Sequence, residues 1–346
     1  MRRFTNQFTI HEMNTLLPHD DAFIRIEEIN SGSRRIQVEM KDLSIFSPRR
    51  QWITRYPLDL IEAVLKVKGP AYLCDEIARD EDPTYVESDI RASLFSYVPK
   101  SHMDGKRLLD FGCGAGASTM IMSRILPNCH VYAVELEERS LALARRRAAY
   151  YHCENLVMLR SPAPDRLPDQ IQQVDYILLS AVYEHLLPNE RQSLLLQMWQ
   201  HLAPEGILFI NQTPDRRFPV ETHTTGLPFI NYLPKFIAGP LARTFSKRGL
   251  HGASWASLLR QGIRGATPTE IMRFLFDSDS SPVLLSPAAE GVQRQSDIWY
   301  RSARVRLSER YTGLQKQIVL ALMSCITLSG VPVAPYISLA IRKSST

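Results

Sequence analysis

From residue 107 onward, short apolar runs alternate with longer segments whose apolar residues recur at helical spacing. The apolar runs predict strands, and they are RLLDFG, HVYAVEL, NLVMLRS, VDYILLS and GILFINQT. Helices are predicted between them in ASTMIMSRIL, EERSLALARRRAAYY and NERQSLLLQMWQHL. Strands that are apolar throughout are typical of a parallel sheet covered on both sides. The pattern therefore predicts an α/β fold with helices on both faces of the sheet.

The first hundred residues have a different pattern. RRIQVEM at 34–40 alternates between apolar and polar positions and predicts a half-buried strand. Apolar positions at helical spacing predict helices over 56–69 and 87–98. We therefore expect an N-terminal accessory region of mixed α and β structure over 1–100, followed by one larger domain over 101–346.

The regular alternation stops after residue 213. The following segment is rich in Pro, Gly and aromatic residues and has no long apolar period, so it predicts an inserted cap or lid over about 214–265. GATPTEIMRFLF then predicts a helix that is capped by Thr267 and has Pro268 in its first turn. SPVLLSP predicts a short strand.

Residues 317–341 carry no charge, and this length could cross a bilayer. Gly330, Pro332 and Pro335 divide the segment, and such residues are typical of a helix end and a turn. We favour a buried helix followed by a core strand in PYISLAI, with a membrane-embedded segment as the alternative. The N-terminus has no apolar run of the secretory type, so we expect a cytoplasmic protein, with membrane association as the alternative.

Charge is distributed unevenly along the chain. The net charge is +5, from 41 basic and 36 acidic residues, but residues 216–346 alone hold 17 basic and 7 acidic residues, a net +10. This asymmetry predicts an anionic partner for the C-terminal third or a solvated basic surface. A solvated surface is also predicted for the arginine run 145–147. The five cysteines form no CxxC pair, which indicates neither a disulfide framework nor a zinc site.

Three glycines follow the first strand of the α/β domain. Gly112, Gly114 and Gly116 allow the backbone to turn tightly and to approach a ligand, which would lie at the N-terminus of the next helix. Glu135 ends the next strand, where a carboxylate can accept hydrogen bonds from both ribose hydroxyls. The spacing is neither that of a dinucleotide motif nor that of a P-loop. Asp110 would repel a pyrophosphate but attract an amino group, so the pattern predicts S-adenosylmethionine.

This series of motifs resembles the class I (Rossmann-like) S-adenosylmethionine-dependent methyltransferases. LLDFGCGAG is similar to their first motif and VYAVEL to their second strand with its ribose-binding acid. VDYILLSAVYEHL and LAPEGILFINQTP are similar to their fourth and fifth strands. The resemblance covers about 105–215 and implies a Rossmann-like methyltransferase sheet. A Rossmann-like domain for another nucleotide is the alternative.

The resemblance also implies which residues contact the cofactor. Asp110 would lie near the methionine amino group, Glu135 would bind the ribose, and Leu136 would flank the adenine. Ser161 departs from the family, because many relatives have an acid there for the adenine amine. In chain order, the implied cofactor residues are Asp110, Gly112, Cys113, Gly114, Gly116, Glu135, Leu136, Ser161, Ser180 and Ala181.

Candidate catalytic residues follow the predicted fourth and fifth strands. Methyl transfer to oxygen needs positioning and can need a base, for which His185, with Glu184, and His223 are candidates. Both have a structural interpretation as well, Glu184 and His185 as a hydrogen-bonded pair and His223 as a loop residue. A Glu-His pair also occurs in metal-dependent relatives that methylate the 3′ end of small RNAs. Ala181 stands where those enzymes have a second glutamate, so no metal site is predicted.

The sequence says less about the methyl acceptor than about the cofactor. The aromatic cap and the basic C-terminal third indicate a small or lipid-like organic acceptor with apolar and anionic parts, methylated at oxygen. Peripheral membrane contact of the cap is an alternative to packing in its core. An RNA methyltransferase is a second hypothesis, ranked lower because no RNA-binding module accompanies the basic residues. A non-catalytic cofactor-binding module is a third, and the intact Asp110, glycine loop and Glu135 argue against it. The oligomeric state is not predicted.

Overall fold

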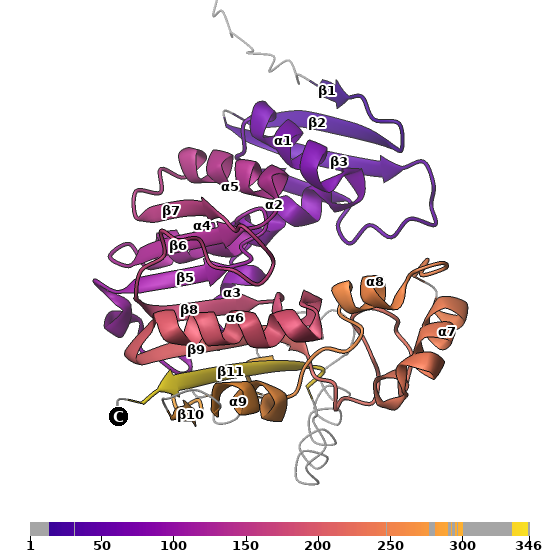
Figure 1. Cartoon of the computed structure of the whole chain (residues 1–346). Helices are drawn as coiled ribbons and strands as arrows, with labels where there is room; N and C mark the ends of the chain where they lie inside the picture. The colour runs from indigo at the N-terminus through magenta and orange to yellow at the C-terminus, as the bar shows by residue number, and fades with distance from the viewer. Residues whose placement is uncertain are drawn as a thin grey trace, which may run out of the picture. The chain divides into compact units, whose positions relative to one another are not determined.

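The computed structural model describes residues 14–30, 32–246, 248–276, 281–289, 292, 295, 297–299 and 334–344 (Figure 1). The chain divides into two compact units, 1–83 and 84–346. The helix expected over 87–98 is α3 (Val86–Phe95), and it belongs to the second unit. Whether residues 1–100 fold as a separate domain stays a prediction.

The first unit is an antiparallel sheet with two helices. The strands follow one another in the order β1 (Asn14–Leu17), β2 (Ala22–Asn30), β3 (Ser33–Met40) and β4 (Gln51–Thr54). The helices are α1 (Leu58–Lys68) and α2 (Leu73–Glu81). Burial alternates along β3, which confirms the predicted half-buried strand. Helix α1 ends at Gly69, whose φ of +74° suits the left-handed turn that stops a helix.

The second unit is built on a seven-stranded sheet in the order β10-β11-β9-β8-β5-β6-β7. Its parallel strands are β5 (Arg107–Phe111), β6 (His130–Glu135), β7 (Leu156–Arg160), β8 (Val174–Ser180) and β9 (Leu202–Pro214). Numbered in chain order, these five have the 3-2-1-4-5 arrangement of a doubly wound sheet. Strands β10 (Pro282–Leu284) and β11 (Tyr336–Lys343) complete the edge, and β11 is antiparallel to both neighbours.

Helices cover both faces of this sheet, as predicted. The helices are α3, α4 (Ala117–Ile125), α5 (Glu138–Tyr150), α6 (Pro188–His201) and α9 (Pro268–Phe276). Leu109 and Ile177 pack in one core with α6 and α9, whereas their neighbours Leu108 and Leu178 pack in a second core with α3 and α4. Strands β5 and β8 therefore need apolar residues at consecutive positions.

Residues 215–265 form an insertion after the end of β9, which we call the cap. It contains α7 (Lys235–Phe245) and α8 (Trp255–Arg260) and has a small core of its own. The chain leaves the sheet after Pro214 and returns at Ala266, where the amide of Ala266 donates to the carbonyl of Pro214 at 2.9 Å and the amide of Arg216 donates to the carbonyl of Ala266 at 2.9 Å. The cap is thus closed at its base by paired backbone.

The uncharged segment 317–341 is only partly within the described residues. Its last part lies in β11, which confirms the predicted core strand, and the predicted helix before it lies outside the described residues. In the described part of the chain, no helix is both long enough and apolar enough to cross a membrane. Helix α9 begins as predicted, because the amide of Glu270 donates to the Thr267 hydroxyl at 3.1 Å.

The prediction of a solvated arginine run is wrong at Arg147. Its side chain is fully buried under the glycine loop, and Nη1 donates to the carbonyl oxygen of Ala115 at 3.0 Å. Arg145, two residues earlier, is half exposed and pairs with Glu138. One arginine of the run therefore supports the loop, because its position on α5 faces the sheet.

Candidate cofactor and acceptor site

The point at which the strand order reverses lies between β5 and β8. From β5 the chain continues through β6 and β7 toward one edge of the sheet. From β8 it continues through β9 toward the opposite edge. Ligands of doubly wound sheets bind outside the carboxyl ends of the strands at such a point. The residues that follow these two strands are Gly112 and Ala181, both predicted from the sequence as cofactor residues.

The glycine loop is held closely against its surroundings. Gly112 has a φ of +78°, and a Cβ there would lie 2.5 Å from Cγ2 of Val182, in the loop after β8. Gly116 has a φ of +86°, and its Cβ would lie 2.8 Å from Cβ of Ala144 on α5. Gly114 has a φ of +56° with no described atom within 4 Å of such a Cβ. Two of the glycines are therefore needed for close packing, and the third for its backbone conformation.

Glu135 joins the glycine loop to the end of β6. Its Oε2 accepts a hydrogen bond from the amide of Gly114 at 2.8 Å. Its Oε1 accepts from the amides of Leu136 and Glu137 at 2.8 and 2.9 Å. These contacts fix the carboxylate at the rim of the loop. Oε2 accepts only one of these bonds, so it keeps acceptor capacity for a further donor, such as a ribose hydroxyl.

A cavity of about 490 Å³ lies at these loops, and we call it the cofactor cavity. Its volume is in the range of small-molecule sites. Five predicted cofactor residues line it, together with His185: Gly112, Glu135, Leu136, Ser161 and Ala181. The other predicted cofactor residues are not in its lining: Asp110, Cys113, Gly114, Gly116 and Ser180.

Asp110 lies beneath the loop. Its Oδ2 accepts hydrogen bonds from the hydroxyls of Thr119 at 2.6 Å and Ser118 at 3.2 Å, both on α4. Burial raises the pKa of Asp110 to about 6, although these hydrogen bonds act in the opposite direction. The predicted contact with a methionine amino group stays a prediction. The Ser161 hydroxyl is directed to its own loop, at hydrogen-bond distance from the carbonyls of Ala163 and Arg166.

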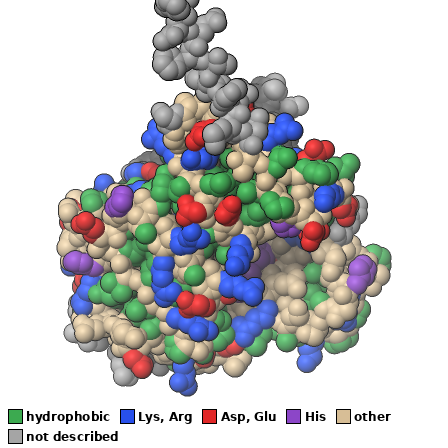
Figure 2. All heavy atoms as spheres, turned by 90° about the horizontal axis from the view of Figure 1, so that it is seen from above, with side chains coloured by type: hydrophobic (Ala, Val, Ile, Leu, Met, Phe, Trp, Pro, Cys, Tyr) green, Lys and Arg blue, Asp and Glu red, His purple; other side chains and the backbone are tan. Residues whose placement is uncertain are grey.

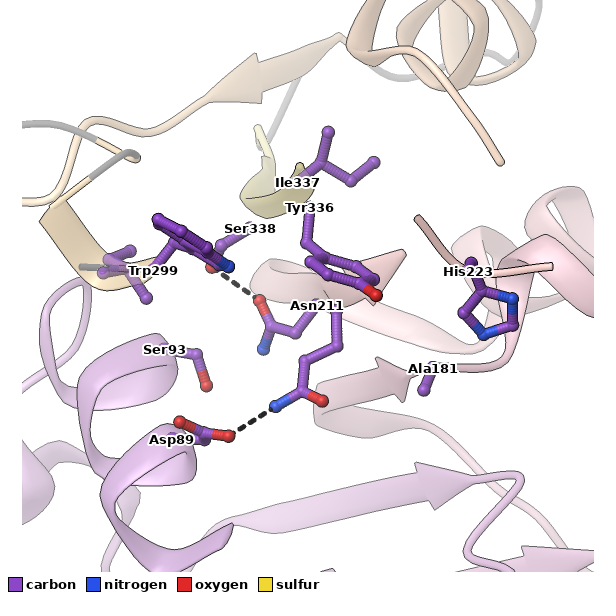
Figure 3. Close-up of a pocket in the computed structure, with 11 residues that line it drawn as sticks. Asp89, Ser93, Ala181, Asn211, His223, Trp299, Tyr336, Ile337 and Ser338 are labelled. Atoms are coloured by element: carbon purple, nitrogen blue, oxygen red, sulfur yellow. Dashed lines mark hydrogen bonds between the residues drawn. The ribbon is translucent and has the colours of Figure 1, made fainter. Parts of the chain in front are cut away.

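A second cavity, of about 210 Å³, shares the lining residue Ala181 with the first, and we call it the acceptor cavity (Figure 3). Figure 3 shows residues from α3, β9 and β11 around it, with His223 of the cap on the side of Ala181. Its described lining consists of Asp89, Ser93, Ala181, Asn211, Gln212, His223, Ile298, Trp299, Tyr336, Ile337 and Ser338. Two of these lining residues were predicted from the sequence as site residues, Ala181 for the cofactor and His223 as a candidate base.

Polar side chains of the acceptor cavity are arranged in two pairs. Gln212 Nε2 donates to Asp89 Oδ2 at 2.9 Å, and the Ser338 hydroxyl donates to Asn211 Oδ1 at 2.8 Å. Asn211 Nδ2 is buried and makes no hydrogen bond to the described residues. Ala181 and Gln212 have φ values of +54° and +57°, and such conformations are costly outside glycine and cluster at functional sites.

Glu184, His185 and His223 come together between the two cavities. Glu184 is fully buried in the 3-10 turn Tyr183–His185, and its Oε2 accepts from the Thr213 hydroxyl at 3.0 Å. Its Oε1 lies 3.9 Å from Nε2 of His185 and 3.9 Å from Nε2 of His223. The sequence offered the two histidines as separate candidates, and the structure places their ring centroids 5.3 Å apart.

Burial dominates the electrostatics of this cluster. It raises the pKa of Glu184, an effect that the charge of a protonated His185 would reduce. It lowers the pKa of His223, and the adjacent His185 lowers it further. An ionised Glu184 therefore needs a specific partner to be stable in this place, whereas burial favours the neutral form of His223.

Many arginines of the C-terminal third are engaged within the second unit. Arg216 pairs with Glu270, Arg217 with Asp215 and Arg260 with Glu190. Others donate to backbone carbonyls of the cap, namely Arg243, Arg248 and Arg264. Lys and Arg side chains also gather beside a hollow on the face shown in Figure 2. Part of the basic surplus thus has a structural role and does not require an anionic partner.

Comparisons with known proteins identify a methyltransferase domain in the part of the chain that contains the glycine loop. A family described as "Methyltransferase domain" matches residues 109–208. A malonyl-[acyl-carrier protein] O-methyltransferase of Bacillus cereus is 29% identical over 132 residues, 36% of this chain and 45% of that protein. A carboxy-S-adenosyl-L-methionine synthase of Aeromonas salmonicida is 31% identical over 127 residues, 36% of this chain and 51% of that protein. The chain thus spans about half the length of these curated relatives.

Solved structures give a more distant likeness. The plantazolicin methyltransferase BpumL, determined in complex with SAH, is 15% identical with a TM-score of 0.43. That alignment covers 83% of this chain and 94% of BpumL.

Proposed function

Because the chain carries a methyltransferase domain of the class I, Rossmann-like, S-adenosylmethionine-dependent family, we propose that it methylates an oxygen atom of a small organic acceptor. One observation carries this proposal. Ala181 lines both the cofactor cavity and the acceptor cavity, so ligands in the two cavities would meet at the end of β8. The named activity of the Bacillus cereus relative, an O-methyltransferase, supports the choice of oxygen.

The cofactor cavity suits S-adenosylmethionine. Glu135 offers a fixed carboxylate to a ribose, and the exposed Leu136 offers an apolar surface to an adenine ring. The absence of a side chain at Gly112 lets the loop approach Val182 closely. Bound there, S-adenosylmethionine supplies an activated methyl group. The protein then needs mainly to hold the acceptor in line with that group.

The acceptor cavity indicates the chemistry of the end that is methylated. Its described lining contains a carboxylate, two side-chain amides and two serine hydroxyls, but no Lys or Arg. Trp299 and Tyr336 add aromatic surface, and the buried Nδ2 of Asn211 is a donor without a partner in the described structure. We therefore propose that this end is uncharged, bears a hydroxyl and has a flat apolar part. An anionic part of the acceptor would lie outside this cavity.

The acceptor hydroxyl must lose its proton when the new bond forms. His223 lines the acceptor cavity, and its Nδ1 lies 3.0 Å from the Gln261 carbonyl, which can only accept. Nδ1 therefore carries the hydrogen, and Nε2 presents a lone pair beside Glu184. We propose that Glu184, His185 and His223 together activate the hydroxyl, because no other described cluster of titratable groups lies between the two cavities.

A screen for the product tests this proposal. The protein would be incubated with methyl-labelled S-adenosylmethionine and a panel of hydroxylated aromatic and aliphatic compounds, and labelled products would be identified by mass spectrometry. Asn211→Leu should abolish labelling, because it removes the free donor of the acceptor cavity and places an apolar side chain there. Calorimetry should show unchanged cofactor binding in that variant, because Asn211 does not line the cofactor cavity.

Two results would count against the proposal. If Asn211→Leu forms labelled product as fast as the unmodified protein does, the acceptor binds outside this cavity. A methyl group found on nitrogen or carbon would contradict the assignment to oxygen. Glu135→Ala serves as the control with weakened cofactor binding.

A further inference from the structure

We infer that Glu184, His185 and His223 bind a divalent transition-metal cation between the cofactor cavity and the acceptor cavity. This inference rests on the proposed function and adds how the hydroxyl is activated. The sequence predicted no metal site, because Ala181 stands where certain metal-dependent relatives have a second glutamate. The structure supplies a different third donor, since the cap places His223 beside Glu184 and His185.

The donor atoms are close enough to share one ion. One ligand atom from each of the three residues lies within 4.8 Å of the others, and both distances from Glu184 Oε1 to a histidine Nε2 are 3.9 Å. Two ligand atoms on tetrahedral zinc, with bonds of about 2.0–2.2 Å, lie about 3.4 Å apart. The carboxylate and each imidazole are about 0.5 Å further apart than this, so a small side-chain movement would close the site around an ion.

Both histidines are oriented for metal binding by backbone carbonyls. His185 Nδ1 lies 2.7 Å from the carbonyl of Arg260, and His223 Nδ1 lies 3.0 Å from the carbonyl of Gln261. These consecutive carbonyls are at the C-terminal end of α8. Because a carbonyl only accepts, each Nδ1 carries the hydrogen and each Nε2 keeps its lone pair on the side of Glu184. A ligating histidine is commonly held by this kind of outer contact.

The buried carboxylate is the independent observation that points to a cation. Glu184 is 0% exposed, and its Oε1 makes no hydrogen bond to any described residue. A buried carboxylate oxygen without a partner is costly, and native structures rarely leave one. Arg191 lies nearby, but its side chain bonds to Glu270 and to backbone carbonyls, not to this oxygen. A cation bound at Oε1 would supply the missing partner.

The position of the cluster gives the ion a role in the proposed reaction. His185 lines the cofactor cavity and His223 lines the acceptor cavity, so an ion on both would be reached from either side. Three protein ligands leave coordination positions open for an acceptor oxygen. The ion would lower the pKa of that hydroxyl, whose proton passes to solvent. The oxygen electron pair then forms the bond to the methyl carbon, the carbon–sulfur bond breaks, and its electron pair returns to sulfur.

The donor set selects the class of ion. Two imidazoles and one carboxylate suit Zn²⁺, Fe²⁺ and Co²⁺, whereas Mg²⁺ prefers oxygen ligands only. Co²⁺ is a suitable probe because its visible absorption reports nitrogen ligation directly.

The test is a titration of the full chain with Co²⁺ after treatment with a chelator and dialysis, without any acceptor. We expect one ion per chain and an absorption band that Zn²⁺ abolishes by competition. Glu184→Gln and His223→Ala should weaken binding by more than about a hundredfold, because loss of an outer contact alone costs up to that much. His251→Ala, an exposed histidine of the same cap, should bind as the unmodified chain does.

The same samples separate this inference from the proposed function. Calorimetry with S-adenosylmethionine and circular dichroism show whether each variant is folded and binds the cofactor. Failure of the unmodified chain to bind Co²⁺ would overturn the metal site, and so would binding that Glu184→Gln and His223→Ala leave unchanged. In either case methyl transfer with His223 as a simple base would remain testable by the product screen.

Discussion

A methyl group placed on Gly262 would lie 2.8 Å from Nδ1 of His223, so the two residues are in direct contact. The same group would lie 3.2 Å from Cγ of Glu184. Gly262 follows α8, whose terminal carbonyls bind both histidines, and its φ is +91°. The turn after α8 therefore determines both the orientation and the available space of the cluster.

Gly262→Ala should consequently weaken Co²⁺ binding by at least about tenfold, because the new methyl group displaces an oriented ligand. The matched control is Gly252→Ala in the same cap, where φ is +77° but no described atom lies within 4 Å of the new methyl group. Both substitutions should cost about 1–3 kcal/mol of stability for the unfavourable φ. Equal Co²⁺ affinity in the two variants would show that Gly262 does not control the cluster.

The cofactor assignment of Glu135 predicts a loss of affinity. Glu135→Ala removes the acceptor of three backbone amides as well as the proposed ribose contact. Hydrogen bonds to a charged group contribute about 1.5–3 kcal/mol, so the dissociation constant for S-adenosylmethionine should rise about 10- to 100-fold. Calorimetric titration measures this directly. Glu138→Ala, an exposed position on α5, should bind normally, and normal binding by Glu135→Ala would refute the assignment.

Close packing at Gly112 predicts a rescue experiment. Gly112→Ala places a methyl group 2.5 Å from Val182 Cγ2, so the loop or Val182 must shift. Both line the cofactor cavity, so cofactor affinity should fall. Adding Val182→Ala removes the collision, so the double variant should recover part of the affinity. Recovery should be incomplete, because the left-handed φ still costs about 1–2 kcal/mol. Gly114→Ala meets no described atom and isolates this conformational cost. No recovery in the double variant would exclude Val182 as the cause.

The central strands of the sheet were predictable from sequence because they are buried on both faces. Leu108 and Leu109, although neighbours, pack in different cores, and such a requirement is visible as an unbroken apolar run. The glycine loop was predictable for a similar reason, since close packing at Gly112 and Gly116 admits no larger residue. Such constraints act on neighbouring residues, so they can be recognised in the sequence as an apolar run or a required glycine.

The cluster and the acceptor cavity were not predictable in the same way. His223 reaches Glu184 only because the cap folds back and pairs Ala266 with Pro214, a long-range contact that no local pattern reports. Asp89 lies on a helix that the sequence grouped with the N-terminal region. Arg147 has the charge of a surface residue and is buried by the packing of α5. Each of these depends on how separate segments meet.

Asp110 ionises at a higher pH in the folded protein than an ordinary aspartate does. Its pKa is about 6 in the folded protein, above the ordinary value of 3.8, because the carboxyl is buried beneath α4. A raised pKa means that the fold prefers the protonated acid, so this group stabilises the protein most below pH 3.8 and no longer stabilises it once the pH has risen past 6. The full contribution is about 3 kcal/mol, of which about 1.4 kcal/mol should be lost between about pH 5 and about pH 7.5.

Asp110→Asn has no such ionisation and can still bond to the Thr119 hydroxyl. We therefore compare the free energy of unfolding of the cofactor-free variant with that of the unmodified protein, both measured by denaturant titration. The variant's value should rise relative to the unmodified protein's by about 1.4 kcal/mol as the pH increases over the same interval. Asp169→Asn, at an exposed position, should show no such gain. A difference between Asp110→Asn and the unmodified protein that does not change with pH would mean that Asp110 is ionised throughout, and that burial does not raise its pKa.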